Sequence, residues 1–195
     1  QKRNMEWFNN IIKNDKEIKF TMTDPISEFI KLNICILTIS SSRTLQNDKS
    51  GDVLEKKISE FGHSVYDRKI VKDNKDKIQE NIINWGNDKN IDVIITTGGT
   101  GLTGSDVTPE SLEEIFEKTI DGFSILFHKI SYEKIKTSTI QSRTTAGIFN
   151  NKFIFALPGS PSAVTDGWDE ILKFQLDSRH RPCNFIDIMP RLAED

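Results

Sequence analysis

The stretch IDVIITTGGTGLTGSDVTPE, residues 91–110, combines a buried strand, a glycine-rich loop and the start of a helix. Its first seven residues are almost continuously apolar or β-branched, which is typical of a strand covered on both faces. The four glycines that follow permit sharp turns and leave backbone N–H groups accessible to a ligand. Thr108 is expected to cap the next helix, and Pro109 suits its first position. The stretch therefore predicts a strand–loop–helix unit.

The same alternation extends to both sides of this unit. Short apolar runs predict strands at residues 32–40, 65–71, 91–97, 144–148 and 153–157. Apolar residues at helical spacing predict helices at residues 54–61, 78–85, from 109 onward, 123–130 and 162–176. Strands that alternate with helices predict a three-layer α/β/α fold, in which a mostly parallel sheet carries helices on both faces.

Length and composition limit the domain organisation and the class of protein. The 195 residues suit a single domain at 29–195, preceded by an N-terminal extension at 1–28 that is polar and expected to be flexible. The 26 basic and 29 acidic residues give a net charge of −3, which argues against nucleic-acid binding driven by net charge. Two cysteines cannot form a disulfide framework, and no apolar run is long enough to span a bilayer. We expect a cytoplasmic protein without a membrane segment.

Four loops are expected at the carboxyl edge of the parallel strands, where such folds bind ligands: residues 40–43, 72–74, 98–106 and 158–162. Asp73 and Asp106 each follow a predicted strand, so both carboxylates should face this edge. Two carboxylates beside a phosphate-binding loop are typical of a Mg²⁺ site. The alternatives are structural: Asp73 could cap the following helix, and Asp106 could stabilise a turn.

The glycine loop also matches two general nucleotide-binding patterns in part. Residues 99–104 satisfy the G-x-G-x-x-G spacing of dinucleotide-binding proteins, but the helix is predicted to begin near Pro109 and not within the glycines. A P-loop requires Lys-Ser/Thr where this chain has Ser105 and Asp106. Neither a nicotinamide enzyme nor a P-loop enzyme is therefore the favoured interpretation.

Seven segments together carry a family resemblance: LTISSSR, DKSGD, IVKDN, TTGGTGLTGSDVTPE, FHKISYEKI, TSTIQSR and FALPGSPSA, in this order. The chain resembles the molybdopterin-binding MoaB/Mog family of molybdenum cofactor biosynthesis over about residues 32–191. The segment QLDSRHRPCNF at 175–185 is more similar to MoaB than to Mog members. The resemblance implies an α/β fold, assembly into trimers or hexamers and, in active members, transfer of AMP from ATP to the terminal phosphate of molybdopterin. A Mog-like SISDR sequence is replaced here by Ser41-Ser42 before Arg43.

The resemblance also implies the site residues. The two functional aspartates of the family match Asp73 and Asp106, which would act in catalysis and hold Mg²⁺. ATP and molybdopterin would be the substrates. The predicted substrate-binding residues are Ser40, Arg43, Ser50, Gly51, Gly98, Gly99, Thr100, Gly101, Arg143, Pro158, Gly159 and Ser160.

Two questions stay open at this point. Some MoaB-like members appear not to catalyse adenylylation, so a non-catalytic molybdopterin-binding or assembly protein is the alternative function. Arg143 could contact a phosphate or form a salt bridge at the surface or between subunits. A Gly99→Val substitution is expected to abolish molybdopterin binding and to leave the thermal transition nearly unchanged, because it adds a branched side chain where a ligand must approach the backbone.

Overall fold

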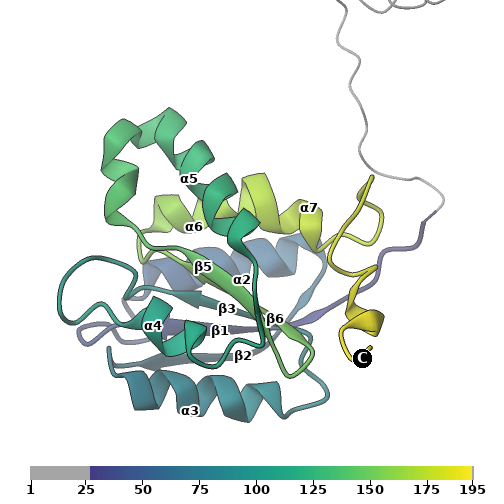
Figure 1. Ribbon diagram of the computed structural model, residues 1–195, viewed down its shortest axis with the longest axis horizontal. Helices are drawn as coiled ribbons and strands as arrows, with labels where there is room; N and C mark the ends of the chain where they lie inside the picture. Colours follow the sequence, from purple (N-terminus) through teal and green to yellow (C-terminus); the bar gives the residue numbers. More distant parts are fainter. Residues whose placement is uncertain (1–26, 195) are drawn as a thin grey trace, which may run out of the picture.

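A computed structural model of the chain describes residues 27–194, so nearly all of the predicted extension lies outside the described residues. The described part is a six-stranded sheet of order β2-β1-β3-β6-β5-β4 with helices on both faces (Figure 1). The strands are β1 (Asn33–Ile39), β2 (Ser64–Val71), β3 (Val93–Thr97), β4 (Lys118–Thr119), β5 (Thr145–Phe149) and β6 (Lys152–Leu157). The α-helices are α2 (Lys49–Phe61), α3 (Lys75–Gly86), α4 (Thr108–Glu113), α5 (Asp121–Ile135), α6 (Pro161–Gly167) and α7 (Lys173–Gln175). Shorter helical segments are η1 (Lys136–Gln141), η2 (Trp168–Leu172) and η3 (Met189–Arg191).

Parallel pairing dominates the half of the sheet that matters for the site. The pairs β2–β1, β1–β3 and β3–β6 are parallel, whereas β6–β5 and β5–β4 are antiparallel. The carboxyl ends of β1, β2, β3 and β6 therefore meet at one edge. The predicted α/β class is confirmed, and the predicted strands at 144–148 and 153–157 form the antiparallel pair β5–β6.

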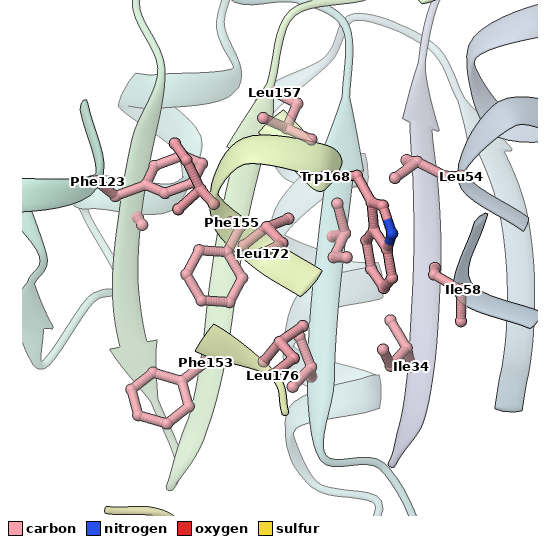
Figure 2. Close-up of a cluster of buried hydrophobic side chains, with 14 of the residues drawn as sticks. Ile34, Leu54, Ile58, Phe123, Phe153, Phe155, Leu157, Trp168, Leu172 and Leu176 are labelled. Carbon is pink, nitrogen blue, oxygen red and sulfur yellow. The ribbon is translucent and has the colours of Figure 1, made fainter. Parts of the chain in front are cut away.

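Each face of the sheet has its own apolar core. On one face, α2, α5 and α6 cover β1, β3 and β6, and Figure 2 shows Trp168 beside Leu54 and Ile58 of α2. Trp168 is only 2% exposed. On the other face, α3 and α4 pack on the same strands through a second cluster that includes Ile78 and Leu112. Strands covered on both faces explain why their sequences are continuously apolar.

Three local features differ from the sequence-based expectations. The predicted helix 162–176 is divided, because a π-helical turn at Trp168–Leu172 separates α6 from α7. The capping prediction for Thr108 is wrong: the N-cap is Val107, and the Thr108 hydroxyl instead donates to Gly98 O at 2.8 Å. The two-residue strand β4 is exposed and lacks an apolar pattern, so nothing in its sequence signalled it.

No helix in the described part of the chain combines the length and the apolar character that crossing a membrane requires.

A buried histidine ties the start of β1 to the end of α7. His63 Nδ1 accepts a hydrogen bond from Leu32 N at 3.1 Å, and Nε2 lies 2.9 Å from Leu176 O. The neutral tautomer with its proton on Nε2 satisfies both contacts. Phe29 stacks on the ring with the centroids 4.9 Å apart. Burial lowers the pKa of His63 to about 4.

We expect His63 to make folding stability depend on pH. Its pKa is lower in the folded than in the unfolded chain, so its contribution is complete above pH 6.5 and is lost as the pH falls from 6.5 towards 4. Between pH 7 and pH 5 the free energy of unfolding should fall by about 2 kcal/mol from this group alone. Urea unfolding at both pH values measures this. A His63→Gln variant should lose this part of the pH dependence, and an unchanged dependence would contradict the assignment.

Candidate functional site

An open pocket lies at the carboxyl edge of the parallel strands and has a volume of about 560 Å³. It is formed by the four loops that the sequence analysis placed at this edge, together with the last residue of η1 and the residue after it. Its wall consists of residues 39–43, 98–101 and 158–160 together with Asp73, Asp106, Gln141 and Ser142. The topology thus brings together loops that are far apart in the sequence.

Asp73 follows β2 and is connected to the loop after β1. Ser41 Oγ donates a hydrogen bond to Asp73 Oδ2 at 2.8 Å. The helix cap that Asp73 could have supplied is made by Asn74, whose side chain accepts from Lys77 N at 2.9 Å. The Asp73 carboxylate is therefore not used for capping and lines the pocket.

Asp106 is the last residue of the glycine loop, and it stabilises a turn within that loop. Its Oδ2 atom accepts from Thr103 N at 2.9 Å and from Thr103 Oγ1 at 2.6 Å. These hydrogen bonds, opposed by partial burial and aided by the charge of Arg143, hold the pKa of Asp106 below its ordinary value. The side chain is thus an ionised carboxylate that is fixed in direction and lines the pocket.

Gly98 and Gly99 adopt backbone conformations that other residues rarely adopt, with φ angles of +105° and +63°. A Cβ atom on Gly98 would lie 2.2 Å from Ile39 O, and one on Gly99 would lie 2.3 Å from Thr108 Oγ1. The expectation that Gly99→Val leaves the thermal transition unchanged is therefore wrong. A side chain at this position would meet protein atoms as well as any ligand, so the variant cannot separate binding from stability.

Arg43 lines the pocket, but Ser50 and Gly51 do not. Both are buried in the first turn of α2, and Ser50 is fully buried. Ser50 Oγ accepts a hydrogen bond from Arg43 Nη1 at 2.7 Å, so the arginine separates it from the pocket. The sequence suggested contact with substrate because the DKSGD segment follows the pocket loop directly, but the helix directs these residues behind Arg43.

Arg143 supports the glycine loop from outside the pocket wall. Its Nε donates to Gly101 O at 2.8 Å, its Nη2 donates to Asp106 O at 2.8 Å, and its Nη1 pairs with Glu110. Its backbone N–H also donates to Thr100 O at 2.9 Å. The guanidinium therefore holds the loop in shape and does not face the ligand space. The geometry therefore favours a structural role for Arg143, through contacts within its own chain, over contact with a phosphate.

Four polar residues of the pocket wall were not among the predicted site residues: Ser41, Ser42, Gln141 and Ser142. The Ser142 hydroxyl oxygen is buried and has no hydrogen-bond partner among the described residues. The signal for all four was present, because they lie in the SSSR and TSTIQSR segments that carried the family resemblance. Only the fold shows that η1 carries the second segment to the pocket.

The donor set suits a hard cation that is shared with a phosphate ligand. Among the described residues, no group of three or more histidine, cysteine, aspartate or glutamate side chains could hold a metal by itself. Asp73 and Asp106 supply carboxylate oxygens to one pocket, and Mg²⁺ is typically held by one or two carboxylates, with phosphate and water completing the shell. The residues present therefore fit Mg²⁺ bound together with a phosphate-bearing ligand.

Fold and site define an α/β protein whose ligand pocket lies at the carboxyl edge of a mostly parallel sheet, built around a glycine loop with two aspartates. Residues 35–178 match the family described as "Probable molybdopterin binding domain". The chain belongs to this family, the MoaB/Mog proteins of molybdenum cofactor biosynthesis.

Named relatives and solved structures agree with this membership. Molybdenum cofactor biosynthesis protein B of Escherichia coli K12 is 43% identical over 164 residues, 84% of this chain and 96% of the relative. A protein of Methanocaldococcus jannaschii named "Probable molybdopterin adenylyltransferase" is 42% identical over 142 residues, 68% of this chain and 82% of the relative. A crystal structure of a molybdenum cofactor biosynthesis protein B superposes with a TM-score of 0.75 at 37% identity, covering 77% of this chain and 94% of that chain. The crystal structure of the tungsten cofactor synthesizing protein MoaB of Pyrococcus furiosus superposes with a TM-score of 0.65 at 33% identity, covering 73% of this chain and 91% of that chain.

Proposed function

We propose that this protein binds molybdopterin and transfers AMP from ATP to its terminal phosphate, with release of pyrophosphate. The observation that carries the proposal is the placement of Asp73 and Asp106 in one pocket with the glycine loop. The name of the archaeal relative supports the same reaction. The membership of the molybdopterin-binding family supports the identity of the acceptor.

The reaction requires alignment and charge neutralisation more than a protein nucleophile. An oxygen of the molybdopterin phosphate attacks the α-phosphorus of ATP, and the bond from that phosphorus to the oxygen bridging to the β-phosphorus breaks. Pyrophosphate leaves with the electron pair of that bond. Catalysis by this chain would consist of holding two polyanions close together and in line, as the pocket's backbone N–H groups and fixed side chains allow.

The charges in the pocket indicate why a divalent cation is needed. Arg43 is the one cationic side chain of the described pocket wall, which also contains the two carboxylates Asp73 and Asp106. A triphosphate and a second phosphate would add several negative charges to this space, which strongly opposes binding without compensation. Mg²⁺ held by Asp73 and Asp106 would supply this compensation by neutralising phosphate charge.

The test is pyrophosphate release by the purified protein. We expect release only when molybdopterin, ATP and Mg²⁺ are all present, with one adenylylated molybdopterin formed for each pyrophosphate. Omitting molybdopterin or chelating Mg²⁺ with EDTA should reduce the rate to background, because in each case one charged partner is missing from the aligned complex. Pyrophosphate release from ATP alone at the full rate would contradict the proposal.

The alternative is a non-catalytic molybdopterin-binding or assembly protein of the same pathway. The observation that favours it is the name of most relatives, which states only a cofactor biosynthesis protein. Saturable binding of molybdopterin without any pyrophosphate release under the same conditions would support this alternative.

Self-assembly into a trimer or hexamer stays a prediction. It is supported by exposed apolar side chains on α5 and on η1, where Ile125 is 70% and Ile140 is 72% exposed. Large apolar side chains left exposed on helices are the kind that an interface with another chain would cover.

A further inference from the structure

A buried carboxylate lies directly behind the pocket, at the start of α2. Asp48 is fully buried and accepts four hydrogen bonds. Its Oδ1 accepts from Ser50 Oγ and from Gly51 N, both at 3.1 Å. Its Oδ2 accepts from Thr38 Oγ1 at 2.6 Å and from Arg68 Nη2 at 3.0 Å. Burial alone raises the pKa of Asp48, but the hydrogen bonds outweigh it and hold the pKa below its ordinary value.

Arg68 balances the charge of Asp48. It reaches α2 from the edge strand β2, and besides Asp48 it contacts Asp52 at 2.8 Å and Glu55 at 2.5 Å. A Cβ atom on Gly51 would lie 2.0 Å from Asp48 Oδ2 and 2.6 Å from Arg68 Nη2, so glycine is required for this close approach. Arg43 contributes a further charge contact, because its Nη1 lies 3.6 Å from Asp48 Oδ1. Asp48 thus acts on the Arg43 guanidinium through this contact as well as through Ser50.

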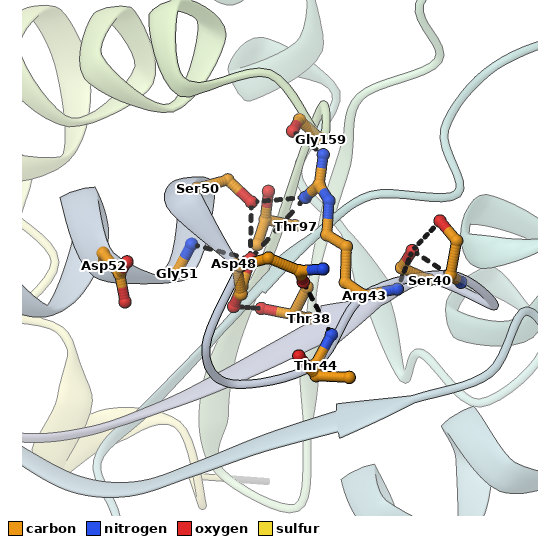
Figure 3. A network of polar contacts seen from close by, with 12 residues as sticks. Thr38, Ser40, Arg43, Thr44, Asp48, Ser50, Gly51, Asp52, Thr97 and Gly159 are labelled. Atoms are coloured by element: carbon orange, nitrogen blue, oxygen red, sulfur yellow. Dashed lines mark hydrogen bonds and ion pairs between the residues drawn. The ribbon is translucent and has the colours of Figure 1, made fainter.

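The hydrogen bonds of Ser50 give its hydroxyl a defined direction. A carboxylate only accepts, so the single hydroxyl proton of Ser50 must point to Asp48. The lone pairs of Ser50 Oγ then face Arg43 Nη1, which donates to it at 2.7 Å. Figure 3 shows the Arg43 guanidinium between Ser50 and Gly159, where Nη2 donates to Gly159 O at 2.8 Å. The guanidinium therefore joins the loop after β1, the start of α2 and the loop before α6.

We propose that Ser50 and Asp48 are positioning residues that act through Arg43: Asp48 orients the Ser50 hydroxyl, and Ser50 fixes the guanidinium for contact with the phosphate of the pterin ligand. This inference rests on the proposed function only in that molybdopterin binds in this pocket. Ser50 and Asp48 are fully buried and outside the pocket wall, so they act on the ligand only through a residue that lines it. Arg43 is that residue.

A double-mutant cycle of Ser50→Ala and Arg43→Ala tests the proposal, with the dissociation constant of molybdopterin as the readout. Ser50→Ala should weaken binding about 3- to 10-fold, the effect of one orienting hydrogen bond. Arg43→Ala should weaken it about 10- to 100-fold, since a charge-assisted contact is lost. In the Arg43→Ala background, Ser50→Ala should have no further effect on binding. Additive losses would overturn the proposal, because Ser50 would then act without Arg43.

Two further variants separate positioning from general damage to the fold. Ser111→Ala is the matched control, because Ser111 is also fully buried, donates to Val107 O at 2.6 Å and lies outside the pocket wall. It should leave affinity unchanged, and an equal loss of affinity would overturn the proposal.

If Ser50→Ala does not fold, Arg43→Lys takes its place. It keeps the charge, but one ammonium group cannot reproduce the two-partner geometry, so affinity should still fall about 3- to 10-fold. Wild-type affinity would overturn the proposal.

The outcomes distinguish this inference from the proposed function. Binding of molybdopterin by the wild-type chain without pyrophosphate release would defeat the adenylyl transfer and leave the positioning role standing. Pyrophosphate release by the wild-type chain, together with additive losses of molybdopterin affinity in the double-mutant cycle, would defeat the positioning role alone. Absence of molybdopterin binding in the wild-type chain would defeat both.

Discussion

An Asp106→Asn variant should fold normally and release pyrophosphate roughly two orders of magnitude more slowly than the wild-type protein. The substitution keeps the size of the side chain but removes the negative charge that, in the proposed function, would hold Mg²⁺ beside the phosphates. The amide oxygen can still accept the hydrogen bonds that Thr103 donates to Asp106 at 2.6 and 2.9 Å. Steady-state rates at saturating molybdopterin and ATP, together with the thermal unfolding midpoint, measure the two effects separately.

The matched control is Asp88→Asn. Asp88 is likewise an aspartate in a turn, where it accepts a hydrogen bond from Asn90 N at 2.9 Å. It precedes β3 and so lies at the amino-terminal edge of the parallel strands, away from the pocket. Its replacement should leave the rate unchanged. If Asp106→Asn kept full activity, the carboxylate would not be needed for the reaction. If the variant unfolded, the carboxylate would have a structural role.

Gly98→Ala should lower the free energy of unfolding by at least about 2 kcal/mol. Two effects add at this position. The φ angle of +105° is unfavourable for any residue with a side chain, and the added Cβ would lie 2.2 Å from the backbone oxygen of Ile39. A backbone atom at the end of β1 cannot move aside as a flexible side chain can. Urea unfolding at pH 7 measures the loss.

Gly104→Ala is the control within the same loop. A Cβ atom there would have no atom within 4 Å, and the residue is not among those with positive φ. Its free energy of unfolding should stay within about 0.5 kcal/mol of the wild-type value. Equal losses of unfolding free energy for both variants would contradict the prediction, because the effect at Gly98 would then not depend on its φ angle or on the contact with Ile39 O.

Periodicity and loop chemistry are sufficient to predict most of the fold. The continuous apolar runs of β1, β3 and β6 predict strands covered on both faces, because burial on two sides leaves no polar alternation. The glycine loop and the following Asp106 predict the position of the pocket, because ligands bind at the carboxyl edge of parallel strands. The family resemblance is the source of the proposed reaction, which no periodicity can specify.

The division of the last helix could not be predicted in this way. The apolar stripe that includes Trp168 and Leu172 has the same spacing in an α-helix and across the π-helical turn that the structure contains. Periodicity reports which side chains are buried, but not the hydrogen-bond pattern of one turn. The prediction that Thr108 caps α4 failed for a related reason, because the Thr108 hydroxyl donates to Gly98 O across the glycine loop.

The fold class, the family and the two carboxylates of the pocket follow from the amino-acid sequence alone, because they depend on local patterns and on residue types at loop positions. Which other polar residues face the ligand space depends on the tertiary structure. Ser50 and Arg143 were predicted to bind substrate, yet one lies behind Arg43 and the other supports the glycine loop. Ser142 was not predicted, yet it lines the pocket. The direction of a side chain depends on how helices and strands pack, and residues distant in the sequence set that packing.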